Sequence, residues 1–442
     1  MKTPLHAALD TYINNDYARF HIPGHKGSDI FKEHNLAKFD VTEVLGTDSL
    51  YESKEAILRT EQAYSDLYAT VKSCISAGGS TLCIQTMIAL VAKKGGKLIC
   101  GRTIHSSAVY AMALLDITPI WVYPKDNDCL GVGGRLLLED IRQAVLENPC
   151  ALGVYLTSPD YFGAISDIKS IATLCKEHNM PLLVDNAHGA HLHFLQPSLH
   201  PIHLGATMCC DSLHKTLPVL TGGAMLHIND QEFSTYAKTR MEILVSTRPI
   251  YIIIISIDIA LNKLKNHIQT DLVALCEIVS TILNLAEKKG FSILSGEQDP
   301  TRISLGFSNM GYTKQTFENH LKKHKIEPEY VSNHFCVLVP SSCTSKADFQ
   351  RVITMIKDCK QTKNSPISPT FLTKPAVAIP MKVAIFSQSI SIKVENAYDK
   401  IASAMLNPCP PGVPLLMPGE VIDSSMIQLL KKYGIKELFV VE

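Results

Sequence analysis

The sequence predicts an α/β fold, in which a largely parallel sheet is covered by helices on both faces and is followed by a smaller α+β domain. From about residue 60 to 230, short apolar runs rich in β-branched residues alternate with amphipathic segments of helix length. Continuous apolar strands separated by helices are typical of parallel sheets that are buried on both faces. After residue 275 the pattern becomes a shorter mixture of helices and strands.

Seven apolar runs are expected to form the strands of the large sheet. Most of them end in a small or polar residue, and ligands of such sheets bind at the carboxyl ends of the strands. The runs are 73–79, 97–101, 119–123, 152–158, 181–185, 206–212 and 222–228.

The length of 442 residues exceeds what one core ordinarily supports, so more than one domain is expected. We expect an N-terminal segment, a large domain, a small α+β domain and a C-terminal domain. The segment 361–375 is polar, contains prolines and is the best candidate for a linker. The expected divisions are 1–60, 61–275, 276–360 and 376–442.

Composition gives no sign of a nucleic-acid or membrane partner. Acidic and basic residues are equal in number, at 42 each. The most apolar run, 250–261, is too short to span a bilayer and is interrupted by Asp258. The 13 cysteines follow no framework spacing, which favours reduced thiols and a cytoplasmic protein.

Lys215 is the strongest single candidate for a catalytic residue. It lies in the segment "DSLHKTLPVLTGG", just beyond a predicted strand. A lysine that is partly removed from water has a lowered pKa and can form a Schiff base with an aldehyde. Taken alone it would be interpreted as a solvated surface lysine, so its neighbours carry the argument.

Three other strand ends provide those neighbours. The turn "GGST" precedes a helix, where free N–H groups and the hydroxyls of Ser80 and Thr81 can hold a phosphate. His105 follows a second strand and can stack on a flat ring, and Asp185 ends a third strand. A carboxylate in that position can hold a protonated ring nitrogen, as pyridoxal phosphate requires. Together the four features predict a pyridoxal phosphate site.

A metal site is the alternative for the histidines that follow Asp185. His188, His191 and His193 show no regular i, i+4 helical pair, and no cysteine pair with zinc-like spacing lies nearby. We therefore expect no metal here. Packing or contact with the cofactor is the preferred interpretation of these histidines.

In these motifs the chain resembles the bacterial ornithine/lysine/arginine decarboxylases, which are fold-type I pyridoxal phosphate enzymes with an aspartate aminotransferase-like fold. The motifs occur in the family's order along most of the chain. They are "FHIPGHKG", "FDVTEVLGTDSL", "GGST", "RTIHSS", "LTSPDYFG", "VDNAHGAH", "DSLHKTLPVLT" and "PPGVPLLMPGE". The absence of a wing domain before "HIPGHKG" resembles the short biosynthetic form.

The resemblance implies roles for individual residues. Lys215 would bind the cofactor covalently, Asp185 would pair with its ring nitrogen, His105 would stack on the ring, and His188 would lie near the ring hydroxyl and the substrate carboxylate. Further cofactor contacts are expected from Gly79, Ser80, Thr81, Ser158, Ser212 and His214.

The resemblance also implies a homodimer with shared active sites, in which Thr247 of "STRPIY" contacts the partner's phosphate. Glu420 is the expected anion for the distal cation of the substrate, and Asp48 is a second candidate. The expected reaction is decarboxylation of a basic amino acid, with arginine ahead of lysine and ornithine, in polyamine metabolism.

Several residues depart from the family pattern. Asn186 stands where the family has glutamate in Asp-Glu-Ala-His, and Asp211 begins a segment that usually reads Gln-Ser-Thr-His-Lys. Ser49 follows Asp48 where a second aspartate is usual, and Arg248 and Ile250 replace two serines of "STSPSY". These departures leave two alternatives open. One is another fold-type I reaction such as transamination, with Arg302 as a candidate clamp for the α-carboxylate, and the other is a non-catalytic homologue.

Overall fold

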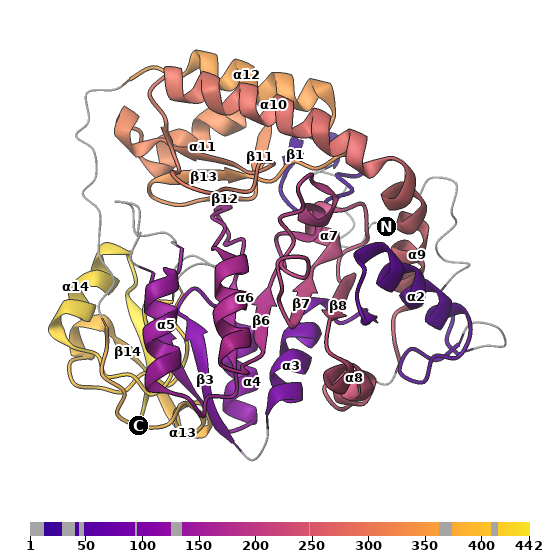
Figure 1. The fold of residues 1–442 in the computed structure, drawn as a ribbon. Helices are drawn as coiled ribbons and strands as arrows, with labels where there is room; N and C mark the ends of the chain where they lie inside the picture. Colours follow the sequence, from indigo (N-terminus) through magenta and orange to yellow (C-terminus); the bar gives the residue numbers. More distant parts are fainter. Residues whose placement is uncertain are drawn as a thin grey trace, which may run out of the picture.

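The computed structural model describes residues 13–28, 40–43, 48–92, 95–124, 135–246, 248–361, 374–407 and 414–442. The large sheet lies in the centre of the molecule, the small domain lies over one end of its strands, and the C-terminal region lies beside α4 and β3 (Figure 1).

The large sheet has seven strands in the order β2-β8-β7-β6-β5-β3-β4. Only β8 runs antiparallel to its neighbours, so the predicted mostly parallel sheet is confirmed. Each predicted apolar run overlaps one strand, and β2, β3 and β4 begin one or two residues before the predicted runs. The strands are β2 (Lys72–Ser76), β3 (Gly96–Gly101), β4 (Ile117–Val122), β5 (Val154–Thr157), β6 (Leu182–Asp185), β7 (Met208–Asp211) and β8 (Ala224–Ile228).

Helices cover both faces of this sheet because the strands are apolar on both faces. In β6, Leu182 and Val184 pack in the cluster formed with α5 (Leu138–Glu147) and α6 (Ile168–Glu177). Leu183 points the opposite way, into the cluster that contains the side chains of α3 (Gly79–Val91), α4 (Ser106–Leu114) and α8 (Gln231–Ile243). The alternation follows from the two-residue period of a strand.

The small domain contains a four-stranded antiparallel sheet in the order β12-β13-β10-β9. A strand from the N-terminal segment, β1 (Ala18–Phe20), pairs in parallel with β11 (Ile326–Pro328) beside it. The remaining elements are β9 (Ser292–Ile293), β10 (Ile303–Gly306), α11 (Lys314–Lys323), β12 (Tyr330–Val331), β13 (Phe335–Leu338) and α12 (Lys346–Asp358).

Helix α10 (Ile268–Lys288) is the one described helix whose length and composition would suffice to cross a membrane. Its buried residues recur at helical spacing, as in Leu272, Leu275, Val279 and Ile282, and they belong to the core of the small domain. The apolar face of α10 is therefore used in packing against this domain.

The C-terminal region forms a small core of its own around a two-stranded antiparallel sheet. Its elements are α13 (Met381–Phe386), β14 (Ser389–Lys393), α14 (Ser424–Lys432) and β15 (Glu437–Val441). In the described parts of the chain, further α-helices are α2 (Ala56–Tyr68), the single turn α7 (Leu213–Thr216) and α9 (Tyr251–Asn266).

Candidate active site

A cavity lies at the carboxyl ends of the parallel strands, where the sequence placed the site. Lys215, Asp185, His105, His188 and Ser80 all line it, so the structure brings together five of the predicted residues. The other lining residues are Ile84, Thr103, Ile104, Thr157, Tyr161 and Ala187.

Lys215 lies on α7, directly after β7, and its amine faces an imidazole. The Nζ atom is 2.9 Å from Nε2 of His188. Burial lowers the pKa of Lys215, and the negative charges of Asp185 and Glu329 oppose part of that effect. The site therefore favours a neutral amine more than water does, and a neutral amine is the form that attacks an aldehyde.

His188 is a neutral hydrogen-bond partner for this lysine. Burial, followed by the charge of Lys215, holds the pKa of His188 well below its ordinary value. Either nitrogen of this contact can be the donor, depending on the tautomer of the ring. The buried Nδ1 atom has no hydrogen-bond partner among the described residues. An unpaired ring nitrogen next to the cavity is a position where a bound molecule can satisfy a polar group.

Asp185 ends β6 and is 2% exposed. Its Oδ1 atom accepts the backbone N–H of Ala187 at 3.1 Å, and its Oδ2 atom accepts the hydroxyl of Tyr155 at 3.4 Å. A carboxylate has about four lone-pair positions, so these bonds orient the group and leave it able to accept another. Asp185 can therefore receive a protonated ring nitrogen in the cavity.

His105 is held as the N-cap residue of α4. Its Nδ1 atom accepts the backbone N–H of Ser107 at 3.2 Å and lies 2.7 Å from the Ser107 hydroxyl. Burial lowers the pKa of His105, which favours the neutral ring. The cap fixes the ring at the cavity wall, as the predicted stacking requires.

The start of α3 provides a phosphate-binding turn. Gly79 has a φ of +68°, which favours glycine, and its N–H is bonded to the Gly222 carbonyl at 2.9 Å. The next N–H groups belong to the first turn, which has no partners within a helix. The Ser212 hydroxyl donates to Ser80 Oγ at 2.7 Å and so ties the turn to the lysine segment. Thr81 is exposed at the same turn.

His214 lies beside Lys215 in α7 and is fixed by the strand behind it. Its Nδ1 atom donates to the Gly223 carbonyl at 3.0 Å, and burial lowers its pKa to about 4. The His214 ring is therefore neutral at pH 7. His214 is not among the residues that line the cavity.

Two threonines that sequence reasoning missed line the cavity. The hydroxyls of Thr103 and Thr157 are buried and have no partner among the described residues. Ser158, which was expected to bind the cofactor, does not line the cavity, and its Oγ atom accepts the backbone N–H of Ser166 at 3.1 Å. Thr157 pairs with Asp185 across β5 and β6, so it takes the place expected of Ser158.

Glu420 does not present a free carboxylate to a substrate, contrary to the expectation from sequence. Both of its oxygens bind the Arg102 guanidinium, at 2.6 and 2.8 Å, and one also accepts the Met417 N–H at 2.8 Å. Arg102 and Glu420 are each 1% exposed. The pair joins the C-terminal region to the end of β3 and is a structural contact.

Asp48 and Thr247 are the remaining predicted site residues. Asp48 accepts the backbone N–H groups of Ser49, Lys54 and Glu55, which organises the loop before α2. Burial raises the pKa of Asp48, but these hydrogen bonds outweigh it and lower the pKa. Thr247 lies outside the described residues.

The other residues raised by the alternatives do not line the cavity. His191 Nε2 lies 2.9 Å from both Asp299 and the Thr301 hydroxyl, and His193 Nδ1 lies 2.7 Å from Nε2 of His203. Arg302 contacts Asp299 at 3.5 Å and donates to the backbone carbonyl of His188 at 3.4 Å.

The cavity is suited to a flat, anionic, aldehyde-bearing ring. It offers a lysine with a lowered pKa, a carboxylate at the end of the neighbouring strand, a fixed imidazole and a helix N-terminus for an anion. The unpaired His188 Nδ1, Thr103 Oγ1 and Thr157 Oγ1 atoms are additional polar groups that a ligand would satisfy. The residues present therefore fit pyridoxal phosphate.

Comparison with known proteins agrees with this site. Residues 3–296 match the family model described as "Orn/Lys/Arg decarboxylase, major domain", and residues 361–435 match its C-terminal domain. The chain is 26% identical over 459 residues to a Bacillus subtilis protein named arginine decarboxylase, covering 98% of this chain and 93% of the relative. It is 22% identical over 299 residues to the constitutive lysine decarboxylase of Escherichia coli, covering 60% and 40%.

Solved structures show the same fold. The Escherichia coli constitutive lysine decarboxylase superposes with a TM-score of 0.76 at 18% identity, covering 100% of this chain and 82% of that one. A serine palmitoyltransferase of Sphingomonas wittichii gives a TM-score of 0.58 at 15% identity, covering 77% and 86%. The predicted fold-type I architecture is therefore confirmed.

Proposed function

The chain belongs to the Orn/Lys/Arg decarboxylase family, and from that premise we propose that it uses pyridoxal phosphate to decarboxylate a basic L-amino acid, arginine foremost. The observation that supports this most is the meeting of Lys215 and Asp185 in one cavity at the strand ends. Arginine is favoured because relatives that carry this name align over 98% of the chain.

When bound, the cofactor supplies an electron sink for the bond that breaks at the α-carbon. Lys215 would bind the cofactor's aldehyde, Asp185 would accept from its ring nitrogen, and His105 would lie against its ring. Ser80, Thr81 and Ser212, with the N-terminus of α3, would hold the phosphate. Thr157 Oγ1 and His188 Nδ1, which have no partner among the described residues, would offer further hydrogen bonds to polar groups of the cofactor or substrate.

Proton transfer at the reacting centre is assigned to Lys215 and His188. Loss of carbon dioxide leaves the α-carbon to be protonated, which requires an acid within reach of that atom. Lys215 Nζ and His188 Nε2 are 2.9 Å apart, so a proton can pass between them. The apolar walls formed by Ile84 and Ile104 disfavour the charged carboxylate relative to neutral carbon dioxide.

We assign the distal cation of the substrate to Glu329 in place of Glu420. Tyr161 lines the cavity and its hydroxyl donates to Glu329 Oε1 at 3.0 Å, while Oε2 accepts the Ile22 N–H at 2.8 Å. Glu329 is also close enough for its charge to raise the pKa of Lys215. Glu329 belongs to the small domain, and its carboxylate contacts the cavity wall through its hydrogen bond with Tyr161.

The assembly and location of the protein are proposals as well, supported by the family resemblance and by the cysteine pattern of the sequence. We propose a homodimer with shared active sites, in which the segment around Thr247 approaches the partner's phosphate. We also propose a cytoplasmic protein acting in polyamine metabolism. The domain divisions 1–60, 61–275, 276–360 and 376–442 remain proposals, with the addition that β1 joins β11 of the small domain.

Separate incubations with arginine, lysine and ornithine test the function. The purified protein with pyridoxal phosphate should release carbon dioxide and an equal amount of amine from at least one of them, and Lys215→Ala should release neither. Glu329→Gln should raise KM by about tenfold or more, because a hydrogen bond to a charged group contributes roughly 1.5–3 kcal/mol. Glu147→Gln, on the exposed face of α5, is the control.

If a keto acid forms and no carbon dioxide is released, the proposed reaction is wrong and the protein is a transaminase. If the protein binds the cofactor but forms no product from any of the three amino acids, the proposed function is contradicted and the non-catalytic homologue is favoured. An unchanged KM in Glu329→Gln would remove Glu329 from the substrate site.

A further inference from the structure

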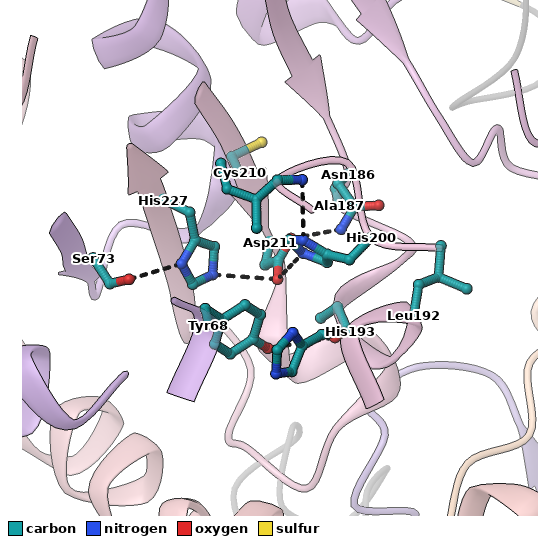
Figure 2. Close-up of polar contacts among 12 residues, drawn as sticks. Tyr68, Ser73, Asn186, Ala187, Leu192, His193, His200, Cys210, Asp211 and His227 are labelled. Carbon is teal, nitrogen blue, oxygen red and sulfur yellow. Dashed lines mark hydrogen bonds and ion pairs between the residues drawn. The ribbon is translucent and has the colours of Figure 1, made fainter. Parts of the chain in front are cut away.

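The carboxylate of Asp211 is a buried charge for which the proposed chemistry has no use. Asp211 ends β7 and has no measurable exposure. Its Oδ1 atom accepts the side-chain N–H of Asn186 at 2.7 Å, and its Oδ2 atom lies 3.0 Å from Nε2 of His200 and 3.4 Å from Nε2 of His227 (Figure 2). Three side chains therefore converge on one carboxylate behind the cavity.

His200 presents an N–H to this carboxylate, because its Nδ1 atom accepts the Ile202 N–H at 3.3 Å. Nδ1 of His227 lies 2.8 Å from the Ser73 hydroxyl, and its Nε2 atom lies within ion-pair distance of Asp211. Their remaining ring nitrogens point to Asp211. Burial raises the pKa of Asp211, but its interactions with His200 and His227 outweigh burial and hold the pKa below its usual value. Tyr68 stacks on His227 at 4.2 Å and encloses the group.

The Asn186–Asp211 hydrogen bond joins the two segments that carry the cofactor residues. Asn186 directly follows Asp185 and precedes His188 by two positions. Asp211 directly precedes Ser212 and lies four positions before Lys215. The backbone N–H of Asn186 also bonds to the Cys210 carbonyl at 3.0 Å. The contact therefore lies where β6 and β7 both turn into the cavity.

This contact changes the meaning of two departures from the family motifs. In sequence, Asn186 looks like the loss of an acid from Asp-Glu-Ala-His, and Asp211 looks like an unrelated replacement of glutamine. In the fold the two positions touch. The amide and the acid have exchanged places, so one negative charge and one amide are kept while the charge has moved to β7, next to His200 and His227.

We propose that Asn186 and Asp211 are a positioning pair whose single hydrogen bond sets the distance between the Asp185 side and the Lys215 side of the cofactor site. Its effect on the cofactor rests on the proposed function, whereas the coupling between the two side chains does not. Each position tolerates an acid only when the other is an amide, because two facing carboxylates in a buried site repel each other.

A double-mutant cycle tests the pair with isosteric changes, namely Asn186→Asp, Asp211→Asn and the double variant Asn186→Asp/Asp211→Asn. In the cofactor-free protein each single variant should lower Tm by several degrees. The double variant should recover a substantial part of that loss, because the hydrogen bond re-forms with its donor and acceptor reversed. Asn319→Asp, on the exposed face of α11, is the control for the same chemical change.

The pH dependence distinguishes Asn186→Asp from a general loss of packing. Its new carboxyl group has a raised pKa in the folded state, since it faces Asp211. A raised folded pKa contributes stability below the unfolded pKa that is lost as pH rises. The Tm deficit of Asn186→Asp should therefore be larger at pH 8 than at pH 5, and the double variant should not show this trend.

Measurements of cofactor binding test the positioning role of Asn186 and Asp211. The dissociation constant for pyridoxal phosphate should rise at least tenfold in each single variant and return toward the wild-type value in the double variant. Additive Tm losses would overturn the coupling, and unchanged dissociation constants would overturn the positioning role. If a single variant fails to fold, the soluble yield of the double variant gives the same comparison. A wild-type protein that binds no pyridoxal phosphate would contradict the proposed function and leave the Tm cycle valid.

Discussion

At the scale of the residue, the pKa of Lys215 is set by two opposing effects, namely its burial and the charges of two nearby carboxylates. Removal from water lowers the pKa of Lys215, while Asp185 and Glu329 raise it. The same burial favours the neutral form of His188, so the amine contacts a neutral ring and not a second cation. The lysine can therefore be neutral below its ordinary pKa and still remain hydrogen-bonded.

This predicts the pH dependence of the reaction of Lys215 with pyridoxal phosphate in the cofactor-free protein. The rate of borohydride-trapped attachment should rise with pH and level off as Lys215 loses its proton. The inflection should lie below about 10.4, the ordinary value for lysine. Asp185→Asn should move the inflection further down, because Asp185 raises the pKa of Lys215. An inflection at or above the ordinary value would refute the assignment.

Sequence reasoning found the residues that follow strand ends but not the finer choice between neighbours. Lys215, Asp185, His105 and His188 each lie just beyond an apolar run, and the parallel sheet brings those ends to one edge. Whether Thr157 or Ser158 faces the cavity depends on the strand's phase at its last residue, which the apolar pattern of the run does not fix.

At the scale of the element, the C-terminal region is held to the large domain by the buried pair of Arg102 and Glu420. Arg102 also lies 5.1 Å from the ring centre of Trp121. No local pattern joins these two residues, which are 318 positions apart. The acid of the "PGE" motif therefore resembled a substrate ligand in sequence and is a structural residue in the fold.

Glu420→Gln is expected to destabilise the protein while leaving KM for the substrate unchanged. Removal of one partner leaves a buried, uncompensated guanidinium, which costs about 3–5 kcal/mol. Replacement of both residues by methionine should cost less, since no unpaired charge is then buried. Chemical unfolding with steady-state kinetics at a permissive temperature measures both quantities. A higher KM with unchanged stability would return Glu420 to the substrate site.

The contact between the ends of β6 and β7 shows why a sequence should not be compared with family motifs one position at a time. Asn186 and Asp211 are 25 residues apart in sequence, and each alone reads as a defect in a motif. Parallel pairing places Asp185 opposite Cys210, and so brings the following residues into contact. The two substitutions can be recognised as a pair only when the pairing of β6 with β7 is known.

At the scale of the whole molecule, the cavity is bounded by parts of the chain that are far apart in sequence. The N-terminal strand β1 pairs with β11, and the loop after it approaches α7, where the Gly24 N–H donates to the His214 carbonyl at 2.7 Å. A Cβ at Gly24 would lie 2.6 Å from the Leu217 carbonyl oxygen, so only glycine fits there.

The sequence predicted the seven strands and the mostly parallel character of the large sheet, because its strands are continuous apolar runs between helices, but it did not predict their order or the antiparallel β8. It did not predict that the N-terminal segment joins the small domain, because Ala18–Phe20 is too short to show a period. It also missed Glu329, whose link to the cavity runs through Tyr161 of a different domain. Contacts between domains leave no periodic signal in either segment.

The central claim is that Lys215 is the lysine that carries the cofactor. Lys26, in "HIPGHKG", is the sharpest rival among the described lysines, because burial lowers its pKa to about 7. Borohydride reduction of the protein with pyridoxal phosphate, followed by peptide mapping in a mass spectrometer, separates the two. The account predicts one pyridoxyl group per chain on the peptide that contains Lys215, and none in Lys215→Ala. Attachment at Lys26, or attachment that survives in Lys215→Ala, would contradict it.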